Sequence, residues 1–336
     1  MRPVILAIES SCDETSASVI VHGKVLNNVI ASQTVHHKYG GVVPELASRA
    51  HQQHIWEVVD EAMRTAAILP SSLSAIAFTK GPGLMGSLLV GVSFAKGMAL
   101  ALGIPLIEVN HMEAHVLAHF INDPTPSFPF LCLTVSGGHT QLVKVNNYLE
   151  MEVIGETQDD AVGEAFDKAA KIMGLPYPGG PLIDQCAKEG NPKAFSFPDT
   201  AMKGLNFSFS GIKTAFLYFL RDRVAEDPAF IENNRNDICA SLQAQLITML
   251  MQKLKRAAIE TGIKQIAIAG GVAANSGLRK AILEAAEKNS WVVFIPDFQY
   301  CTDNAAMIAM AAHYKYLQNR FTTLDVAPMA NLSIGL

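Results

Sequence analysis

The same order of apolar runs and polar turns occurs twice along the chain. In the first half, the continuous apolar run VILAI (4–8) is followed by the polar turn ESSCDET and the alternating run SASVIV. In the second half, FLCLTV (130–135) is followed by the turn SGGHT and the run QLVKV. Short apolar runs bounded by turns are typical of buried strands, and alternation is typical of half-buried strands. The pattern therefore predicts two similar sheets, each of which begins with strands joined by short turns.

Each half then continues as a strand, a glycine-containing turn, a helix and another strand. AIAFT (75–79) leads through KGPGLMGS into a helix to about Ala101, and QIAIA (265–269) leads through GGVAANS into a helix to about Lys288. Two such halves predict a duplicated α/β architecture, with mixed sheets covered by helices on both faces and a small-molecule site in the cleft between the domains. The expected boundaries are residues 1–110 for the first domain, 111–310 for the second, and 311–336 for a segment that packs back on the first.

Composition favours a globular, cytoplasmic protein. A chain of 336 residues, 49% of them hydrophobic, is long enough for two core-forming units. Its net charge of −5 gives no overall attraction to nucleic acid or acidic membranes, so a nucleic-acid partner would need a local basic face or a helper subunit. The five cysteines are scattered without a CxxC pair, which favours a reducing compartment over a disulfide framework or a zinc ribbon.

No membrane segment is expected, although residues 84–109 are apolar enough to be considered as one. Lys96 lies in the middle of this stretch, and Gly103 and Pro105 interrupt it before the strand-like IPLIEV. A buried helix followed by a buried strand explains this pattern better than a membrane span. The apolar run at the N-terminus ends at Glu9 and is too short for a signal peptide.

The stretch HMEAH (111–115) has the spacing of a metal site on a helix. No helix breaker follows until Asp123, and on a helix His111 and His115 lie one turn above each other, about 40° apart. Glu113 lies about 200° round the helix from His111, whereas the glutamate of the zinc-protease motif HExxH directly follows the first histidine. The pattern indicates a chelating pair without the protease base; the alternative is a solvated helix face.

A third metal ligand has to come from elsewhere in the chain. His119 continues the spacing but lies about 12 Å along the helix from His111, too far to share one ion. The candidates are His139 in the second polar turn, Cys301, and Asp303, which a last helix returning across the cleft could bring close. The alternative role of Asp303 is to stabilise the N-terminus of that helix by its charge.

Glycine pairs follow strands at two places, Gly137-Gly138 and Gly270-Gly271. A backbone without side chains can approach phosphate closely, and helix N-termini favour its negative charge. A single glycine pair usually marks an ordinary tight turn. Two pairs in equivalent contexts make a phosphate-binding role as well supported as a turn.

Nine segments, spread over about residues 4–312, together resemble a known family. Their combination is highly specific. The segments are IESSCDET, YGGVVPELASRAH, TKGPGLMGSLLVG, NHMEAH, VSGGHTQL, GEAFDKAAKIMGLPYPGGP, FSFSGIKTA, AGGVAANSGLR and CTDNAAMIA. In these segments the chain resembles the bacterial catalytic subunits of the universal tRNA threonylcarbamoyladenosine transferase family.

The resemblance implies a fold of the kind found in actin, sugar kinases and the large heat-shock chaperones, with two RNase-H-like domains around a nucleotide cleft. It implies transfer of the threonylcarbamoyl group from threonylcarbamoyl-adenylate to the exocyclic amine of the adenosine just 3′ of the anticodon, in tRNAs that read codons beginning with A. The partners that the family implies are TsaB-type and TsaE-type proteins, which would supply dimerisation and ATP hydrolysis.

The resemblance also implies which residues bind an ion and which bind the adenylate. His111, His115 and Asp303 would hold one divalent metal ion, either Fe²⁺ or Zn²⁺. Archaeal and eukaryotic members have a tyrosine ligand at the position of Thr134, so three protein ligands and open coordination positions are expected here. The residues implied for the adenylate are Thr134, Val135, Ser136, Gly137, Gly138, Asp167, Gly180, Asp184 and Asn275.

Several of these residues have ordinary structural roles as alternatives. Asp167 could pair with Lys171 one turn along a helix, and Asn275 could cap the helix that follows GGVAA. Asp13 and Glu14, in the first polar turn, are candidates to accept the amine proton, and their alternative role is loop capping. Because the acyl donor is already activated as a mixed anhydride, the protein mainly has to position donor and amine and stabilise oxyanion charge.

Two other functions remain open from the sequence. A small-molecule kinase or an ATPase could use the same fold, and ATP turnover by the purified chain would distinguish either from a transferase. A metalloprotease is opposed by the position of Glu113 on the helix. Threonylcarbamoyl transfer is the function that the sequence favours.

Overall fold

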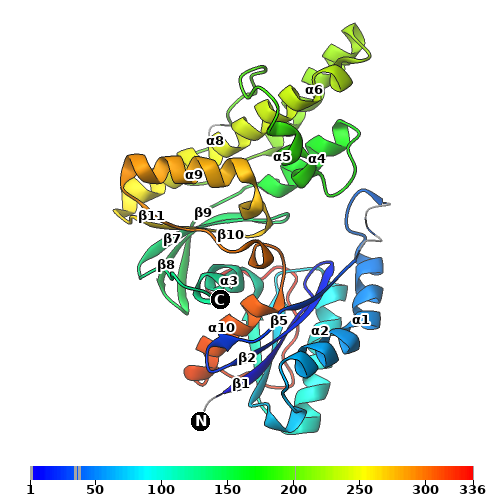
Figure 1. The fold of residues 1–336 in the computed structure, drawn as a ribbon, viewed down its shortest axis with the longest axis vertical. Coiled ribbons are helices and arrows are strands. Elements are labelled where there is room, and N and C mark those ends of the chain that lie inside the picture. Colours follow the sequence, from blue (N-terminus) through cyan, green and yellow to red (C-terminus); the bar gives the residue numbers. More distant parts are fainter. Residues whose placement is uncertain (1–2, 34–35, 37–38, 201, 336) are drawn as a thin grey trace. The chain divides into compact units, whose positions relative to one another are not determined.

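The computed structural model describes residues 3–33, 36, 39–200 and 202–335. The chain forms two compact units (Figure 1). The first comprises Met1–Pro126, Asn146–Glu152 and Pro296–Leu336, and the second comprises Ser127–Val145 and Val153–Ile295.

The first unit is built on a mixed sheet with the strand order β3-β2-β1-β5-β6, in which β4 also pairs with β2. Its strands are β1 (Val4–Glu9), β2 (Glu14–Val21), β3 (Lys24–Val25), β4 (Val29–Ser32), β5 (Ala75–Gly81) and β6 (Leu106–Asn110). β2 runs antiparallel to β1, whereas β1, β5 and β6 are parallel neighbours in that order. The three parallel strands therefore end at the same edge of the sheet.

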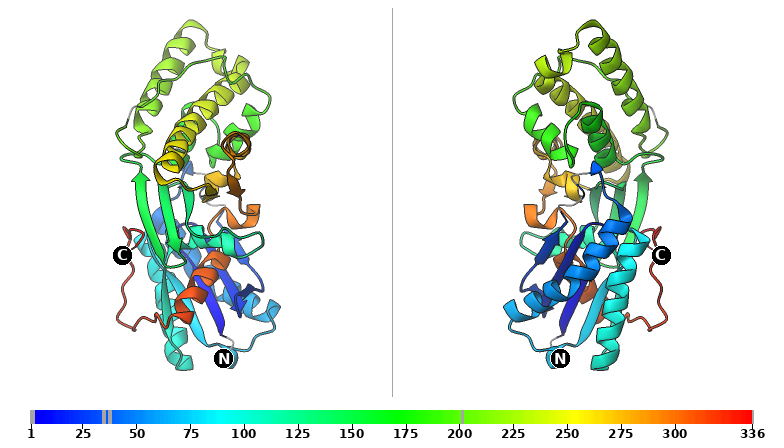
Figure 2. Two further views of the ribbon diagram at one scale, coloured as in Figure 1. Left: turned by 90° about the vertical axis from the view of Figure 1, so that its left-hand side faces the viewer. Right: turned by 90° about the vertical axis from the view of Figure 1, so that its right-hand side faces the viewer.

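Helices cover both faces of this sheet (Figure 2). α1 (Pro44–Thr65) and α2 (Met85–Leu102) pack on one face, in a core that contains Leu6 and Ile76. α10 (Ala305–Leu317) packs on the other face, in a core that contains Ile5 and Ile107. Because successive strand residues enter opposite cores, both must be apolar, which explains the continuous apolar run in β1. The shorter helical segments of this unit are η2 (Pro70–Ser72), α3 (His111–Leu117), η3 (Ala118–Phe120) and η5 (Phe298–Tyr300).

Within the described part of the chain, α2 is long and apolar enough to cross a membrane. It packs against β5 and α1, and it buries Leu88, Val92 and Ala95 in the core of the first unit. Gly103 ends the helix in the left-handed conformation, and the mostly buried β6 follows. These are the helix and the strand that the sequence predicts for the apolar stretch.

The second unit repeats the topology of the first. Its sheet has the order β11-β10-β7-β8-β9, so β7, β8, β9, β10 and β11 take the places of β1, β2, β3, β5 and β6. β8 is antiparallel to β7, and β10 is parallel to both β7 and β11. The predicted duplicated α/β fold is therefore confirmed. The strands are β7 (Phe130–Val135), β8 (Thr140–Asn147), β9 (Glu150–Glu156), β10 (Gln265–Ala269) and β11 (Val292–Phe294).

Most helices of the second unit, from α4 to α8, lie between β9 and β10, whereas α9 lies between β10 and β11 and corresponds to α2 of the first unit. The long α8 packs against α5 and α9, and α4 packs against α5 and α6. The helical segments are α4 (Val162–Ile172), α5 (Gly179–Ala187), α6 (Ser210–Glu226), α7 (Phe230–Asn233), α8 (Arg235–Thr261), η4 (Gly271–Ala274) and α9 (Ser276–Asn289).

The observed division of the chain differs from the expected boundary at residue 110. The HMEAH helix and Asp303 belong to the first unit rather than to a second domain that carries both sites. The reason is local: α3 continues directly from the last strand of the first sheet, and α10, which follows Asp303, packs on β1 and β2. The adenylate residues implied by the resemblance, from Thr134 to Asn275, remain in the second unit.

Candidate functional site: a metal group and a glycine-rich turn

The first candidate site begins where β6 passes directly into α3. Asn110 is the N-cap of α3, and its side chain accepts hydrogen bonds from the N–H groups of Met112 and Glu113 at 2.9 and 3.3 Å. Its amide nitrogen donates to the carbonyl of Ser333 at 2.8 Å. An N-cap of this type satisfies donors that a helix leaves free in its first turn. The cap therefore starts the helix at His111 and fixes the direction of its first turn at the edge of the sheet.

His111, His115 and Asp303 form a group of three potential metal ligands whose donor atoms lie within 4.8 Å of one another. Oδ1 of Asp303 is 3.2 Å from Nε2 of His111 and 3.2 Å from Nε2 of His115. Both imidazoles are almost completely buried, whereas about a fifth of the Asp303 side chain (21%) is exposed. The two histidines are thus one helical turn apart on the same face, as predicted, and Asp303 is the third member.

The pKa values of the residues in this group depend on one another. Burial opposes the ionisation of Asp303, but the His111 charge and hydrogen bonds from both imidazoles hold the pKa of its carboxyl well below the usual range. Burial also works against a charged His111, yet the carboxylates of Asp303 and Glu9 raise its pKa well above the usual value. Burial lowers the pKa of His115. Two imidazoles and a carboxylate that converge in this way fit a divalent metal ion, which would replace the proton held by His111.

The structure adds residues to this site that the sequence did not single out. Glu9, the last residue of β1, is completely buried, and its Oε2 lies 3.0 Å from Nδ1 of His111. The hydroxyl of Thr79 donates to the same oxygen at 2.7 Å, and the N–H of Ser11 donates to Oε1. The hydroxyl of Ser11 lies 3.2 Å from Nδ1 of His111. A buried carboxylate at the end of a strand is the only sequence signal that could have indicated Glu9.

Glu113 points away from the metal group. Its Oε1 accepts a hydrogen bond from the N–H of Gly335 at 3.2 Å, and its Oε2 lies 4.0 Å from the ammonium of Lys315. The predicted separation of Glu113 from the histidines is therefore confirmed. This glutamate cannot act on a water at His111 and His115 in the way that a zinc-protease base does.

The other candidate ligands lie outside the group of three. The Cys301 thiol is fully buried and faces the carbonyls of Pro296 and Asp297, at 3.8 and 3.6 Å from Sγ. His139 belongs to the second unit. The helix that starts at His111 ends at Leu117, and a 3-10 turn carries His119. The first turn of α10 is capped by the Asn304 side chain, and Asp303, directly before it, also lies at the N-terminal end of this helix.

Asp13 and Glu14 lie in the turn between β1 and β2 and at the start of β2, in the same unit as the metal group. Burial, the negative charge of Asp303, and the charge and hydrogen bond of Asp13 raise the pKa of Glu14 to about 10. At neutral pH Glu14 therefore holds a proton in the chain without a bound cation. A nearby positive charge would favour its ionised form.

In the second unit, the residues from Thr134 to Gly138 form the end of β7 and a tight turn into β8. The N–H of Ser136 donates to the carbonyl of His139 at 2.8 Å, and the hydroxyl of Ser136 accepts from the N–H of His139 at 3.1 Å. Thr134 is buried and donates its hydroxyl to the carbonyl of Gln141 at 3.3 Å. Gly137 and Gly138 have open space where a Cβ would be. Hydrogen bonds between Ser136 and His139 therefore close the turn, and its two glycines leave space beside the backbone.

Other segments contact this turn closely. A Cβ added to Gly163, in the first turn of α4, would lie 2.5 Å from the carbonyl oxygen of Ser136. A Cβ added to Gly270 would lie 2.4 Å from the carbonyl oxygen of Val135, and Gly270 also has a φ of +89°. Both positions require glycine, for the close approach of backbone at each and for the left-handed φ at Gly270. Gly270 thus allows the end of β10 to approach the end of β7 closely, and it also forms a turn.

Asp167, Asp184 and Asn275 all bind helix N-termini within the second unit. Oδ1 of Asp167 accepts from the N–H groups of Gly179 and Gly180, the first residues of α5, at 2.8 and 3.1 Å. Asp184 accepts from the N–H of Ser276 at 3.2 Å and from its hydroxyl at 2.8 Å. The alternative pairing of Asp167 with Lys171 is not among its bonds. Burial raises the pKa of Asp167, and the Gly180 and Gly179 N–H groups oppose that rise.

Asn275 is the N-cap of α9, as one of its alternatives predicts. Its Oδ1 accepts from the N–H of Leu278 at 2.9 Å, and its Nδ2 donates to Oε1 of Gln243 at 2.7 Å. The amide therefore joins the start of α9 to α8. Any ligand that it binds would share an atom with these bonds or displace them.

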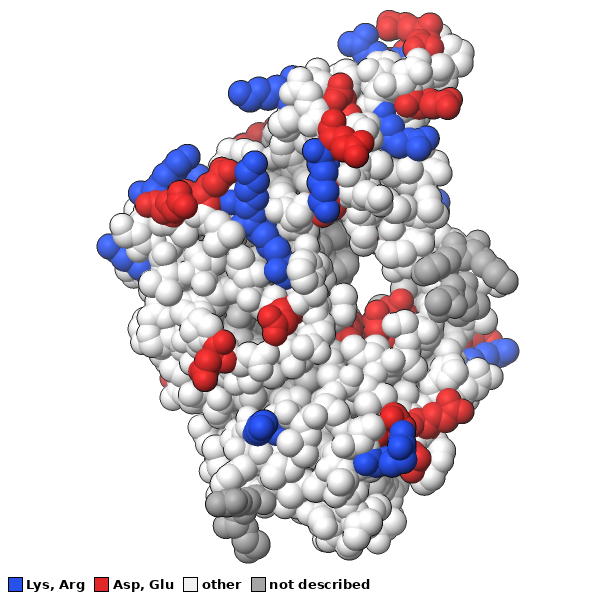
Figure 3. Space-filling view, viewed as in Figure 1, with Lys and Arg blue, Asp and Glu red and all other residues white. Residues whose placement is uncertain are grey.

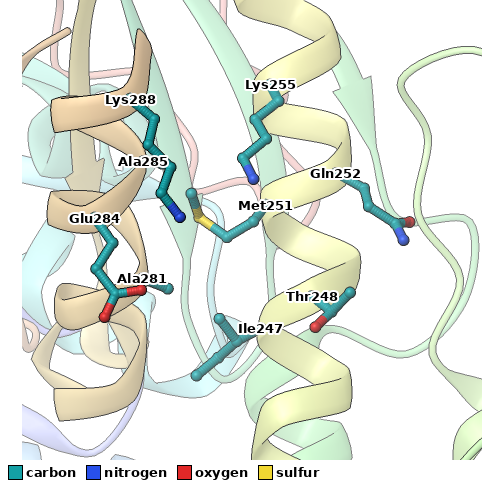
Figure 4. Close-up of a pocket in the computed structure, with 9 residues that line it drawn as sticks. All are labelled: Ile247, Thr248, Met251, Gln252, Lys255, Ala281, Glu284, Ala285 and Lys288. Carbon is teal, nitrogen blue, oxygen red and sulfur yellow. The ribbon is translucent and has the colours of Figure 1, made fainter. Parts of the chain in front are cut away.

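The second unit also contains a shallow pocket of about 220 Å³ between α8 and α9 (Figure 4). Its floor is formed by Ile247 and Met251, and the side chains of Lys255 and Lys288 point into it from the two helices. None of the predicted site residues lines this pocket. On the face in Figure 3, acidic and basic side chains are interspersed, in line with the net charge of −5.

Comparison with known proteins decides the family. Residues 24–310 match the family model for tRNA N6-adenosine threonylcarbamoyltransferase (TsaD). The chain belongs to this tRNA N6-adenosine threonylcarbamoyltransferase family. A member from Cytophaga hutchinsonii is 65% identical over 100% of this chain and 98% of its own length. Members from Porphyromonas gingivalis and Clostridium botulinum strain 657 are 58% and 50% identical, each over 98% of both chains.

Membership of this family confirms the resemblance seen in the sequence and the predicted enzyme class, a threonylcarbamoyltransferase. Solved structures of other proteins share the fold at low identity. Full-length HypF in a phosphate- and nucleotide-bound form has a TM-score of 0.64 at 11% identity, covering 94% of this chain and 46% of HypF. Component A of (R)-2-hydroxyglutaryl-CoA dehydratase from Acidaminococcus fermentans has a TM-score of 0.54 at 13% identity, covering 95% and 99% of the two chains.

Proposed function

We propose that this chain transfers a threonylcarbamoyl group from threonylcarbamoyl-adenylate to the exocyclic amine of the adenosine 3′ of the anticodon, in tRNAs that read codons beginning with A. The product is N6-threonylcarbamoyladenosine in tRNA, and AMP is released. The full-length match to the tRNA N6-adenosine threonylcarbamoyltransferase family is the observation that carries this function. In the reaction the bond between the carbamoyl carbon and the phosphate oxygen breaks, and a bond from that carbon to the amine nitrogen forms.

His111, His115 and Asp303 hold one divalent ion in this proposal. The convergence of their donor atoms, which all lie within 4.8 Å, supports the assignment. Two histidines and one carboxylate with open positions suit Fe²⁺, and a site with three protein ligands also suits catalytic Zn²⁺. When bound, the ion supplies Lewis-acid stabilisation of developing negative charge or an anchor for the threonyl end of the donor.

The adenylate binds the second unit in this proposal, at the residues from Thr134 to Gly138 together with Asp167, Gly180, Asp184 and Asn275. The open space at Gly137 and Gly138 supports close approach of a phosphate to the backbone. Asp167 and Asp184 carry acceptor oxygens that suit ribose hydroxyls. Since both already bind helix N-termini, they would also hold α5 and α9 in place around the nucleoside.

Asp13 is the group that we assign to accept the amine proton, with Glu14 as its partner. Their position supports this role, because both lie in the same unit as the metal group and Glu14 is close enough to Asp303 for the two charges to interact. Glu14 ranks second because it already holds a proton in the chain without a bound cation.

We also propose that the chain acts in the cytoplasm. Its partners in this proposal are proteins of the TsaB and TsaE types. Exposed apolar side chains on the first unit support a protein partner there: Trp56 on α1 is 66% exposed, and Met85 and Leu89 on α2 are 45% and 47% exposed. α1 and α2 pack against each other, and apolar side chains that lie together on a surface mark a binding face. We expect a TsaB-type protein to cover them.

One reconstituted reaction tests the proposal. The chain, with and without both partner proteins, is mixed with synthetic threonylcarbamoyl-adenylate and unmodified tRNA, and nucleosides from the tRNA are analysed by mass spectrometry. We expect N6-threonylcarbamoyladenosine in the complete mixture. ATP turnover by the chain alone, with no modified nucleoside in any mixture, would favour the kinase or ATPase alternative.

A further inference from the structure

Glu9 and His111 form a buried contact at one edge of the first sheet. Glu9 closes β1, Thr79 lies near the end of β5, and His111 follows the last residue of β6. The strand register pairs Ile8 with Phe78 and Phe78 with Glu108, so these three strand ends lie next to one another. Parallel strands that end together place their following side chains along one edge. The sheet thus places the Glu9 carboxylate next to Nδ1 of His111, on the side of the ring that faces away from Asp303.

We propose that Glu9 is a positioning residue for the metal group: it fixes His111 with the proton on Nδ1, so that the Nε2 lone pair faces the ion. This inference rests on the metal-binding part of the proposed function. Each nitrogen of His111 faces a carboxylate, and only one of these carboxylates belongs to the metal group: Nε2 lies 3.2 Å from Oδ1 of Asp303, whereas Nδ1 lies 3.0 Å from Oε2 of Glu9, on the other side of the ring. Nδ1 must donate to Glu9, because an ionised carboxylate only accepts.

Hydrogen bonds hold the Glu9 carboxylate in one orientation, in which it can accept a hydrogen bond from His111. The Thr79 hydroxyl donates to Oε2 at 2.7 Å, and the Ser11 N–H donates to Oε1. Both carboxylate oxygens are therefore held in place, and the residue is fully buried. Metal-ligating histidines commonly donate their second N–H to a carboxylate, which orients the ring and makes the ligating nitrogen more basic. Because Glu9 is fully buried behind the ring, its proposed role is to position His111 and not to act on the substrate.

His115 provides an internal contrast. Its Nδ1 is buried and has no hydrogen-bond partner among the described residues. Its orientation therefore depends on packing in α3 and on Asp303. If Glu9 positions His111, removal of the carboxylate should disturb one ligand of the three and leave the other two unchanged.

The test is metal affinity of the purified chain without substrate or tRNA. Zn²⁺ and Co²⁺ dissociation constants are measured by competition with a chromophoric chelator for the parent, Glu9→Gln and Glu108→Gln. We expect Glu9→Gln to weaken affinity by about 10- to 100-fold. Glu108 is the matched control, because it is a partly buried carboxylate on the same sheet that bonds Lys80 at 2.9 Å and does not contact the metal group. Its variant should bind like the parent.

A second measurement uses the parent chain alone and reports directly which nitrogen of His111 carries the proton. In the zinc-loaded parent labelled with ¹⁵N-histidine, NMR should show a proton on Nδ1 of His111 and zinc on Nε2.

Melting temperatures of the metal-free chains show whether Glu9→Gln damages the fold. A purely structural role would lower the metal-free melting temperature and leave the dissociation constant of the folded protein unchanged.

The outcomes are distinct. Equal affinity of Glu9→Gln and the parent, equal weakening by Glu108→Gln, or zinc on Nδ1 of His111 would each overturn the role of Glu9 while leaving the metal group in place. A parent chain that binds neither Zn²⁺ nor Co²⁺ would overturn the metal group and this inference together. If Glu9→Gln does not fold, the NMR spectrum of the parent decides the question.

Discussion

Nε2 of His115 lies 3.2 Å from Oδ1 of Asp303, although the two residues are 188 positions apart in the sequence. The contact exists because α3 begins at the edge of the first sheet while the segment that precedes α10 returns to the same unit. Oδ1 of Asp303 also faces His111 at 3.2 Å. One carboxylate oxygen thus joins both histidines, in the arrangement that a shared divalent ion requires.

Loss of any one ligand should therefore remove both metal and activity. His115→Ala or Asp303→Ala leaves two of the three protein ligands, so we expect bound metal to fall to a small fraction of the parent value, and transfer activity to fall with it. Elemental mass spectrometry and nucleoside analysis measure the two quantities. His54→Ala, which removes a half-exposed histidine from α1, is the control and should retain both. Full metal content in His115→Ala would show that this residue is not a ligand.

Glu113→Gln should keep its metal and most of its activity. The carboxylate bonds Gly335 and lies near Lys315, away from the histidines, and an amide oxygen can still accept from the Gly335 N–H. In a protease of the HExxH type, the same change removes the general base and abolishes turnover while sparing the metal. Metal content and transfer are measured as above. A variant with full metal and no transfer would show that Glu113 acts in the reaction.

Asn275→Ala should have two separable effects. Loss of the N-cap of α9 should lower the free energy of unfolding by about 1 kcal/mol, measured by chemical denaturation. Binding of a non-hydrolysable adenylate analogue should weaken in calorimetry, while the metal stays bound. Asn275→Asp is the control for the cap, because its carboxylate can accept from Leu278 and Gln243 can turn its amide to donate. If Asn275→Ala is less stable but binds the analogue like the parent, the residue is only a cap.

Binding of tRNA by the chain alone should be weak and should fall steeply with salt. The chain has 26 Lys and Arg against 31 Asp and Glu, so any RNA contact relies on a few local cations that displace counterions from phosphate. Filter binding at several salt concentrations gives the slope. Addition of the partner proteins should tighten binding. Tight binding by the isolated chain that does not change with salt would contradict this picture.

Much of the fold could be predicted because both sheets use the same order of strands and turns. The four-residue spacing of His111 and His115 was enough to predict a shared helix face, because that geometry is local. Asp303 was one of three candidates from the residue chemistry, and only the family resemblance selected it. The boundary between the units was harder to predict, since the N-terminal half of the chain and the last helix share one sheet.

Glu9 was missed because its contact with His111 depends on strand order. The sequence shows a glutamate after an apolar run, but not that β5 and β6 lie beside β1 in the sheet. The partners of Asp167 and Asp184 were missed for a similar reason. Both bind the first turn of another helix, and the pairing of Asp167 with Lys171 was only the nearest local alternative. Tertiary contacts thus determine the bonds of these carboxylates.

The most direct test of the transferase function follows a labelled donor into tRNA. Threonylcarbamoyl-adenylate labelled with ¹³C in the threonyl group is given in limiting amount to the complete enzyme system, with tRNA that carries either adenosine or guanosine 3′ of the anticodon. We predict that the label enters only the adenosine-containing tRNA as N6-threonylcarbamoyladenosine, with one AMP released for each modified nucleoside, and that Asp303→Ala prevents this. Equal labelling of both tRNAs, or none in either while the parent binds metal and hydrolyses ATP, would contradict the function assigned to this chain.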